Sequence, residues 1–356
     1  MKNKMLRFPD RARRSKKAQV ETQLNWIFIL IVGAVILAFF AFIVIKQRAA
    51  AEAKFSGKIA QQLNTIFTGA KVASGTVQEI PTPEVSIRFD CNDYYIGPTS
   101  QRMGNRVVFA PEFVEGKKII TWTRDWNVPF KISSFLYVTA PTVRYIVIGE
   151  EADEPKANAL YDALPDKLNK DIFSLNDYEM NNIVNEDDKY VRFILVDIST
   201  LNIPTAFDDV SVTGLEVDTS LDPLYSAKSV KFLARAASAP RTFNTGATHY
   251  YTEEEVMYGA IFSDNSDEYE CIMRRAYERF NIVARVYKEK LDALASAFDG
   301  SNCEGFYENN QDIAELIGST NQYPGEQQSY DAIVSTKAGL KDSNTRLQLY
   351  SCPLIY

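Results

Sequence analysis

A run of twenty consecutive uncharged, mostly large apolar residues, from Trp26 to Ile45, constrains this chain more than any other feature. At a rise of 1.5 Å per residue, a helix of about 20 residues spans the ~30 Å hydrocarbon core of a bilayer. A buried helix of a soluble domain rarely lacks a polar face over such a length. We therefore predict one transmembrane helix over residues 24–46, which makes the lipid bilayer the first expected partner.

Basic residues precede this segment. Residues 1–17 contain eight Lys and Arg and one acidic residue, a net charge of +7, and since the whole chain carries −7, the remainder carries −14. Because positively charged flanks stay on the cytoplasmic side, we expect residues 1–23 to form a cytoplasmic leader of a cell-membrane protein and residues 47–356 to be extracytoplasmic. So acidic a body argues against nucleic acid as a partner.

A cleaved secretory signal is the main alternative interpretation of the apolar run, because small residues follow it at Ala49, Ala50 and Ala51. An ordinary secretory signal has an apolar stretch of only about 7–15 residues and no charge before its cleavage site. Here Lys46 and Arg48 separate the apolar run from the alanines. We therefore expect the helix to be retained as an anchor.

The residues just before the helix, Lys16-Lys17-Ala18-Gln19-Val20-Glu21, resemble the class III signal peptides of archaeal type IV pilin-like proteins. In that family a prepilin peptidase removes a basic leader before a Gln, and the apolar helix stays on the mature protein to pack into a filament. The resemblance covers about the first fifty residues and implies cleavage between Ala18 and Gln19. Gln23 stands where the family usually has Glu, and an uncleaved anchor is the alternative. Over its full length the chain resembles archaeal single-span membrane proteins, which implies no function.

A helical stalk is predicted over residues 47–75. Gly75 favours its end, and Pro81 and Pro83 prevent the helix from resuming. The apolar residues after the span recur at the spacing of one helix face, namely at Phe55, Ile59, Leu63, Ile66, Phe67 and Ala70.

The exported part divides into three regions by pattern. Residues 84–148 contain short β-branched and aromatic segments between turn residues, which predicts mainly antiparallel strands, with a hairpin turn at Glu115-Gly116. Residues 142–236 alternate strand and helix with continuous apolar strands, which indicates an α/β region with a buried sheet. Residues 250–356 are predicted to be helical. The fold class is thus a mixed α+β and α/β ectodomain on an N-terminal transmembrane helix.

The helical region carries two start signals. Thr252 and Glu255 have the spacing of a capping box, and Ser266 or Asp267 would cap a long helix that continues to Phe298. Apolar residues recur along this long helix at steps of three and four. Such a stripe fits either a coiled-coil seam or the core face of a local bundle, and we favour the bundle.

All four cysteines follow the apolar run, and an even number in an oxidising compartment predicts two disulfides. An unbroken helix from Cys271 to Phe298 would cover about 40 Å, whereas the five residues from Phe298 to Cys303 retrace at most about 18 Å. A Cys271–Cys303 bond is therefore excluded. We predict Cys271–Cys352, with the C-terminal segment returning antiparallel, and Cys91–Cys303 by elimination. A four-cysteine zinc site is the alternative, disfavoured because no Cys-x-x-Cys pair occurs.

Motifs for catalysis and cofactor binding are missing from the sequence. His249 is the single histidine, so multi-histidine metal sites within one chain are excluded, and a packing or surface role is favoured for it. There is no Gly-x-Ser-x-Gly elbow, no Gly-x-Gly-x-x-Gly fingerprint and no phosphate-binding Gly-x-x-x-x-Gly-Lys loop. We predict neither catalytic residues nor a cofactor.

Two predicted strands end in acidic residues, and ligands of α/β sheets gather at the carboxyl ends of strands. Glu150 and Asp153 follow one strand, and Asp197 and Ser199 follow another. The segment Asp197-Ile198-Ser199-Thr200 partly resembles the Asp-x-Ser-x-Ser motif of von Willebrand A-type domains, with Leu201 in place of the last Ser. These oxygens are candidate ligands of a divalent cation, although a solvated loop explains the same residues.

The sequence therefore favours a single-pass, membrane-anchored, extracytoplasmic protein with a structural or interaction role, of which a pilin-like subunit is the most specific form. Its expected partners are the lipid bilayer and other proteins or further copies of itself. An anchored ligand-binding receptor or metal-dependent enzyme that uses the acidic sheet edge around Asp197 is the alternative.

Overall fold

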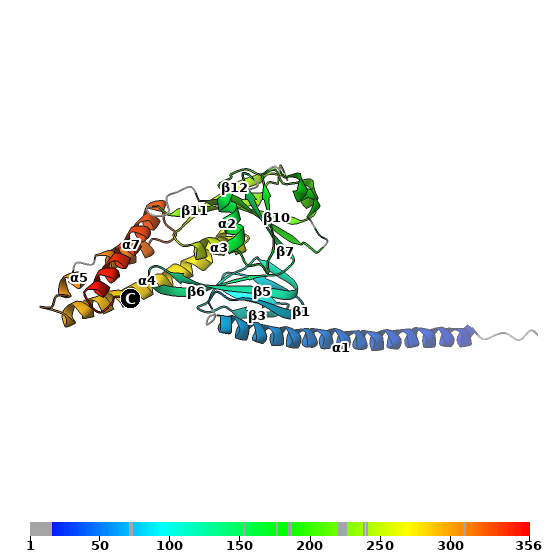
Figure 1. Ribbon diagram of the computed structural model, residues 1–356. Helices are drawn as coiled ribbons and strands as arrows, with labels where there is room; N and C mark the ends of the chain where they lie inside the picture. Colours follow the sequence, from blue (N-terminus) through cyan, green and yellow to red (C-terminus); the bar gives the residue numbers. More distant parts are fainter. Residues whose placement is uncertain are drawn as a thin grey trace, which may run out of the picture. The chain divides into compact units, whose positions relative to one another are not determined.

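The computed structural model describes residues 16–70, 74–151, 154–175, 177–183, 185, 187–219, 226–237, 239, 241–308 and 311–356. Most of the predicted leader, residues 1–15, lies outside this set. The chain divides into two compact units at Phe55 and Ser56, and we call the second unit, residues 56–356, the head. The fold is mixed α/β with a long N-terminal helix, two mixed sheets and helices in the C-terminal part, which confirms the coarse prediction (Figure 1).

Helix α1 runs from Lys16 to Ala70 without a break. Within the first unit its apolar stretch leaves large side chains exposed, such as Trp26 at 73% and Leu37 at 72%. Its length and composition suffice to cross a membrane. No other helix of the described residues meets that criterion.

The last part of α1 belongs to the core of the head. Ile59, Leu63 and Phe67 are at most 4% exposed and share a core with the first sheet. The hydroxyl of Tyr94 donates to the Ala60 carbonyl over 2.9 Å. Residues 56–70 of the predicted stalk therefore belong to the head, because their apolar face packs in the core of the first sheet.

The first sheet is mostly antiparallel and has the order β3-β2-β1-β5-β6-β4. Only β4 and β6 pair in parallel. The hairpin predicted at Glu115-Gly116 is wrong, because both residues lie inside one long strand, β5, and Gly116 adopts a φ of 134° there. The strands are β1 (Val77–Phe89), β2 (Asp93–Ile96), β3 (Thr99–Arg102), β4 (Val107–Phe109), β5 (Phe113–Asn127) and β6 (Lys131–Thr139).

The second sheet has the order β12-β11-β10-β9-β7-β8. Strands β8, β7, β9 and β10 are parallel, while β11 and β12 are antiparallel additions. All seven residues of β7 are buried, as expected of a strand covered on both faces. The elements are β7 (Val143–Gly149), α2 (Pro155–Ala163), β8 (Asn169–Ser174), β9 (Tyr190–Val196), β10 (Ser211–Asp218), β11 (Lys228–Arg235) and β12 (Phe243–Tyr251), with 3-10 turns at Tyr178–Asn182 and Thr205–Phe207.

The C-terminal region is helical, as predicted, and the capping differs in detail. The long helix α4 is capped by the side chain of Asn265, which accepts from Glu268 N over 2.9 Å, one residue before the predicted cap. The predicted Thr252 capping box is wrong, because Glu255 instead forms an ion pair with Arg124 at 3.1 Å. The helices are α3 (Glu254–Phe262), α4 (Ser266–Ala297), α5 (Glu304–Glu308), α6 (Asp312–Thr320) and α7 (Gln327–Leu349).

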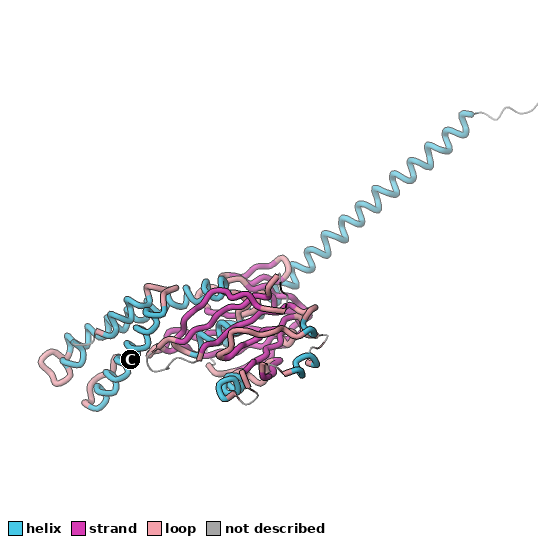
Figure 2. Tube along the Cα trace, turned by 90° about the horizontal axis from the view of Figure 1, so that it is seen from above, coloured by secondary structure: helices cyan, strands magenta, loops and turns pink. Residues whose placement is uncertain are grey.

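One core joins the two sheets, and α3 lies at the join. The ring of Phe262 contacts Tyr137 of the first sheet and Tyr145 of the second, each with a centroid distance of 5.3 Å. The hydroxyl of Tyr137 donates to the Glu255 carbonyl over 2.7 Å. The three regions predicted from the sequence are thus parts of one packed head rather than separate domains (Figure 2).

Both predicted disulfide pairings are wrong. The structure pairs Cys91 with Cys271 and Cys303 with Cys352, each with Cα atoms 5.9 Å apart. Helix α4 is unbroken, as the exclusion of a Cys271–Cys303 bond required.

The error lies in the direction of the last helix. The short helix α6 returns along α4, where Asn281 donates to the Ile317 carbonyl over 3.1 Å. Helix α7 therefore starts beside the first half of α4, with Tyr330 in ring contact with Tyr277 at 6.0 Å. It then runs in the same direction as α4, so Cys352 arrives at the far end, next to Cys303.

Candidate functional site

The acidic residues singled out from the sequence lie at the carboxyl edge of the second sheet. Glu150 directly follows β7, and Asp197 directly follows β9, its parallel neighbour. Glu150 and Ser199 are exposed, and Asp153 lies outside the described residues. Among the residues that the structure describes, no three His, Cys, Asp or Glu side chains are grouped so as to hold a metal ion.

Asp197 binds its own chain. Its carboxylate accepts from Lys156 Nζ at 2.7 Å and from both the backbone N and the hydroxyl of Thr219 at 2.6 Å. Partial burial alone would raise the pKa of Asp197, but these hydrogen bonds outweigh it and lower the pKa below its usual value. The backbone adopts a φ of 54° at this residue. Asp197 therefore ties α2 and the end of β10 to the end of β9.

His249 is a packing residue, one of the two roles that the sequence favoured for it. It lies in β12, is 7% exposed, and places its Nε2 2.7 Å from the hydroxyl of Ser266. Its ring meets Phe232 and Tyr269 edge to face. Burial lowers the pKa of His249, so the imidazole is neutral near pH 7.

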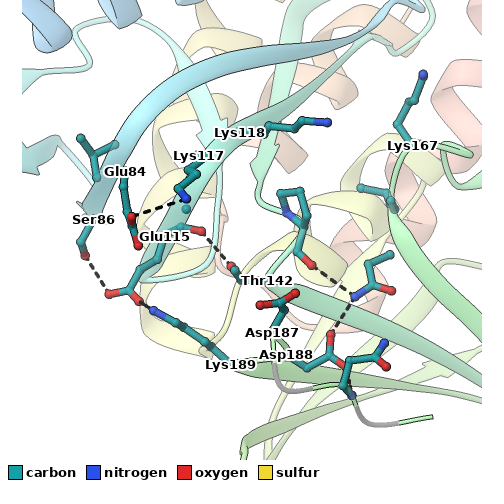
Figure 3. Close-up of a pocket in the computed structure, with 16 residues that line it drawn as sticks. Glu84, Ser86, Glu115, Lys117, Lys118, Thr142, Lys167, Asp187, Asp188 and Lys189 are labelled. Carbon is teal, nitrogen blue, oxygen red and sulfur yellow. Dashed lines mark hydrogen bonds and ion pairs between the residues drawn. The ribbon is translucent and has the colours of Figure 1, made fainter.

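A large hollow of the described head lies at the opposite, amino edge of the parallel strands. It has a volume of about 1060 Å³ and lies between the first sheet and the starts of β7, β8 and β9 (Figure 3). Strands β1 and β5 form one wall, and the segments before β8 and β9 form the other. Its charged lining residues are Glu84, Glu115, Lys117, Lys118, Lys167, Asp187, Asp188 and Lys189.

Ion pairs within the chain neutralise the lysines of this groove. Lys189 Nζ lies 2.6 Å from Glu115, which also accepts from the Ser86 hydroxyl at 3.0 Å, as Figure 3 shows. The hydrogen bond from Lys189 lowers the pKa of Glu115 despite its partial burial. Lys118 and Lys167 both lie 3.5 Å from Glu79, and Lys117 pairs with Glu84 at 3.9 Å, where both side chains are 77% exposed.

A buried ion-pair network holds the far wall in place. Arg144, 6% exposed, donates from Nε to Asp188 over 2.8 Å and from Nη1 to Asp171. Asp188 also accepts from Asn169 at 2.9 Å and from the backbone N of Asn185 at 2.9 Å. Because a buried charge is costly without partners, this network fixes the loop before β9 against the starts of β7 and β8.

The lining of the groove offers both signs of charge, already paired within the chain. Its lining residues provide lysines, carboxylates, amides and hydroxyls, and they include no thiol or imidazole for nucleophilic chemistry. Sequence reasoning missed this groove because its residues come from segments between Glu84 and Lys189 that meet only in the fold. The charged run Glu115-Gly116-Lys117-Lys118 was the available signal, and the turn interpretation obscured it.

Comparison with known protein families, curated proteins and solved structures finds no significant match to this chain.

Proposed function

We propose that this chain is a single-pass, membrane-anchored, extracytoplasmic protein with a structural or interaction role. The observation that carries the proposal is the apolar part of α1, whose large side chains from Trp26 to Ile45 are exposed on every side of the helix. In water, such a surface costs about 25 cal/mol per Å² of apolar area, so the segment requires lipid or protein around it.

The cysteines support export of the head. All four follow the apolar segment and form two disulfides, Cys91–Cys271 and Cys303–Cys352. Disulfides persist in oxidising compartments and are rare in the cytosol. With the basic leader inside, the head is outside the cytoplasm.

The most specific form of the proposal is a pilin-like subunit, which depends on processing of the leader between Ala18 and Gln19. Mass spectrometry of the mature chain from its native membrane tests this form, and we expect an N-terminus at Gln19. An intact Met1 would refute the processing and leave an uncleaved anchor.

Extraction at alkaline pH tests the anchor itself. Carbonate at about pH 11 strips peripheral proteins, whereas a helix buried in the hydrocarbon core stays with the membrane pellet. We expect the full chain in the pellet. A matched variant with Val32→Lys, Val35→Lys and Phe39→Lys is expected in the supernatant, because each Lys costs about 2.5–3.5 kcal/mol near the bilayer centre. Release of the unaltered chain would contradict the anchor.

The alternative of a metal-dependent receptor or enzyme at the acidic sheet edge gains no support from the contacts there. Both oxygens of Asp197 already accept hydrogen bonds from Lys156 and Thr219. We therefore do not adopt it.

A further inference from the structure

Three arginines surround a hollow of about 340 Å³ beside the outer face of α4. Arg275 and Arg279 belong to α4, and Arg106 belongs to the loop between β3 and β4. Acceptors of the head hold each guanidinium in place. Arg275 donates to the Arg106 carbonyl over 3.0 Å, Arg279 to the Ile132 carbonyl over 3.0 Å, and Arg106 to the Thr68 hydroxyl over 2.7 Å.

The hollow carries an excess of positive charge, with three arginines against one acidic lining residue. None of the three arginines forms an ion pair with a described carboxylate, in contrast to the lysines of the large groove. Glu278 is the single acidic residue among those that line the hollow. Arg275 already donates from both terminal nitrogens to acceptors between Cys91 and Arg106. Arg279 is held through Nε, so among the described residues its terminal nitrogens are oriented and left for a carboxylate.

An apolar ridge continues from the hollow along α4. Ile282 and Val286 are 63% and 58% exposed. With Arg275 and Arg279 they follow one another at steps of four, three and four residues, which places all of them on one stripe of the helix. We call these four residues and Arg106 the α4 face. It fits a surface that offers both apolar side chains and carboxylates.

A second exposed apolar patch lies at the far end of the helices. Leu349, Tyr350 and Leu354 are 77%, 64% and 40% exposed, and the Cys303–Cys352 disulfide holds their segment next to α5. Two acids lie on the α5 side of this bond. Glu304 follows Cys303 directly, and its carboxylate accepts from Gly300 N over 2.8 Å beside the exposed Asp299. We call the three apolar residues with Asp299 and Glu304 the tip patch.

These two surfaces account for every exposed large apolar side chain of the described residues outside α1. One combines apolar side chains with arginines that form no ion pair among the described residues, and the other combines them with carboxylates. We propose that the α4 face of one copy of the chain binds the tip patch of a second copy. The inference rests on the proposed interaction role and names its partner. Because the two surfaces differ, the contact is heterologous and can repeat from copy to copy.

Site-specific photo-cross-linking of the full chain in its native membrane tests this contact. A benzoylphenylalanine at Ile282 is expected to give a cross-linked dimer whose joined peptide contains residues 349–354. The same probe at Asp162, an exposed position on α2, is the matched control and is expected to give no dimer. Absence of a dimer from Ile282, or cross-links from it only to lipid or to other proteins, would overturn the proposal.

Exchanging the charges of Arg279 and Glu304 tests whether these two residues meet in the contact. Arg279→Glu is expected to lower the cross-linked fraction about tenfold, and Glu304→Arg in the second copy to restore it. Since Arg279 also holds the Ile132 carbonyl, Leu349→Lys supplies a variant at a side chain that is 77% exposed, with the same expected loss. A cross-linked fraction unchanged by Leu349→Lys would overturn the contact.

Membrane retention at alkaline pH is measured on the same samples. A chain that is retained but does not cross-link from Ile282 refutes the contact alone. A chain that cross-links but is released refutes the anchor alone.

Discussion

Glu268 carries a buried carboxyl group in the first turn of α4. Its side chain is buried, and Oε1 has no hydrogen-bond partner among the described residues. Burial, reinforced by the negative charges of Asp264, Asp90 and Glu112, raises the pKa of Glu268 to about 8. The carboxyl group of an unfolded chain ionises near pH 4.5, so the folded protein binds one proton more between the two values. Its stability therefore falls as the pH rises from about 4.5 to 8.

Glu268→Gln keeps the shape of the side chain and removes its charge. We expect this variant to have a weaker pH dependence of unfolding between pH 5 and 8, and to be more stable than the unaltered protein at pH 8.5 by about 1–3 kcal/mol. Chemical unfolding of the full chain in detergent, followed by circular dichroism, measures this. Glu289→Gln, at an exposed position of the same helix, is the matched control. Parallel pH profiles for Glu268→Gln and the unaltered protein would contradict the assignment.

Asp197 shows why the candidate site could be predicted only in part at this scale. An acidic residue after a buried strand has the same local pattern whether it binds a cation or its own chain. What decides is the position of Lys156, 41 residues earlier, and of Thr219, 22 residues later. Local periodicity does not reveal that residues so far apart in the sequence are in contact. For His249, the single histidine, the sequence left a packing and a surface role open, and its 7% exposure in the fold decides for packing.

The second half of α1 is an element of the head, and this has a measurable consequence. Phe67 is 1% exposed and contacts the rings of Tyr94 and Phe89 at 5.6 and 6.4 Å. Removing a buried phenyl ring costs about 3–5 kcal/mol through lost burial and the cavity left behind. We expect Phe67→Ala to lower the unfolding free energy of the head by this amount, measured by urea unfolding of the full chain in detergent.

Phe55→Ala is the matched control, because Phe55 belongs to the same helix and is 48% exposed. We expect it to change the unfolding free energy by less than about 1 kcal/mol. Equal effects of the two substitutions would mean that the end of α1 does not pack on the first sheet.

Periodicity predicted the existence of the long elements, and it did not predict their directions. The stripe of α4 indicated one long helix, which the structure contains from Ser266 to Ala297. The disulfide prediction was wrong because it assumed that the C-terminal helix runs antiparallel to α4. Helix α6 already returns along α4, so the following helix, α7, runs in the same direction as α4. The predicted capping box at Thr252 was also wrong because of a contact distant in sequence. Glu255 forms an ion pair with Arg124 and does not cap the helix.

At the scale of the molecule, the mixed α/β class, the long N-terminal helix and the helices of the C-terminal part followed from the sequence, and the core shared by the two sheets did not. Strand Val143–Gly149 lies where the predicted β-rich and α/β regions overlap, and it pairs in the second sheet. Helix α3 then joins both sheets through Phe262. Patterns in a window of about ten residues report burial and give no information on which buried faces meet.

Labelling of engineered cysteines on intact cells tests most directly whether the head lies outside the cytoplasm. Native cysteines are all in disulfides, so a single new thiol at Ala53→Cys, before the head, or at Lys290→Cys, on α4, is the sole target of a membrane-impermeant maleimide. The account predicts that both positions react before lysis, while the thiols of cytoplasmic proteins in the same cells react only after it. Reaction of both positions only after lysis would place the head in the cytoplasm and contradict the account.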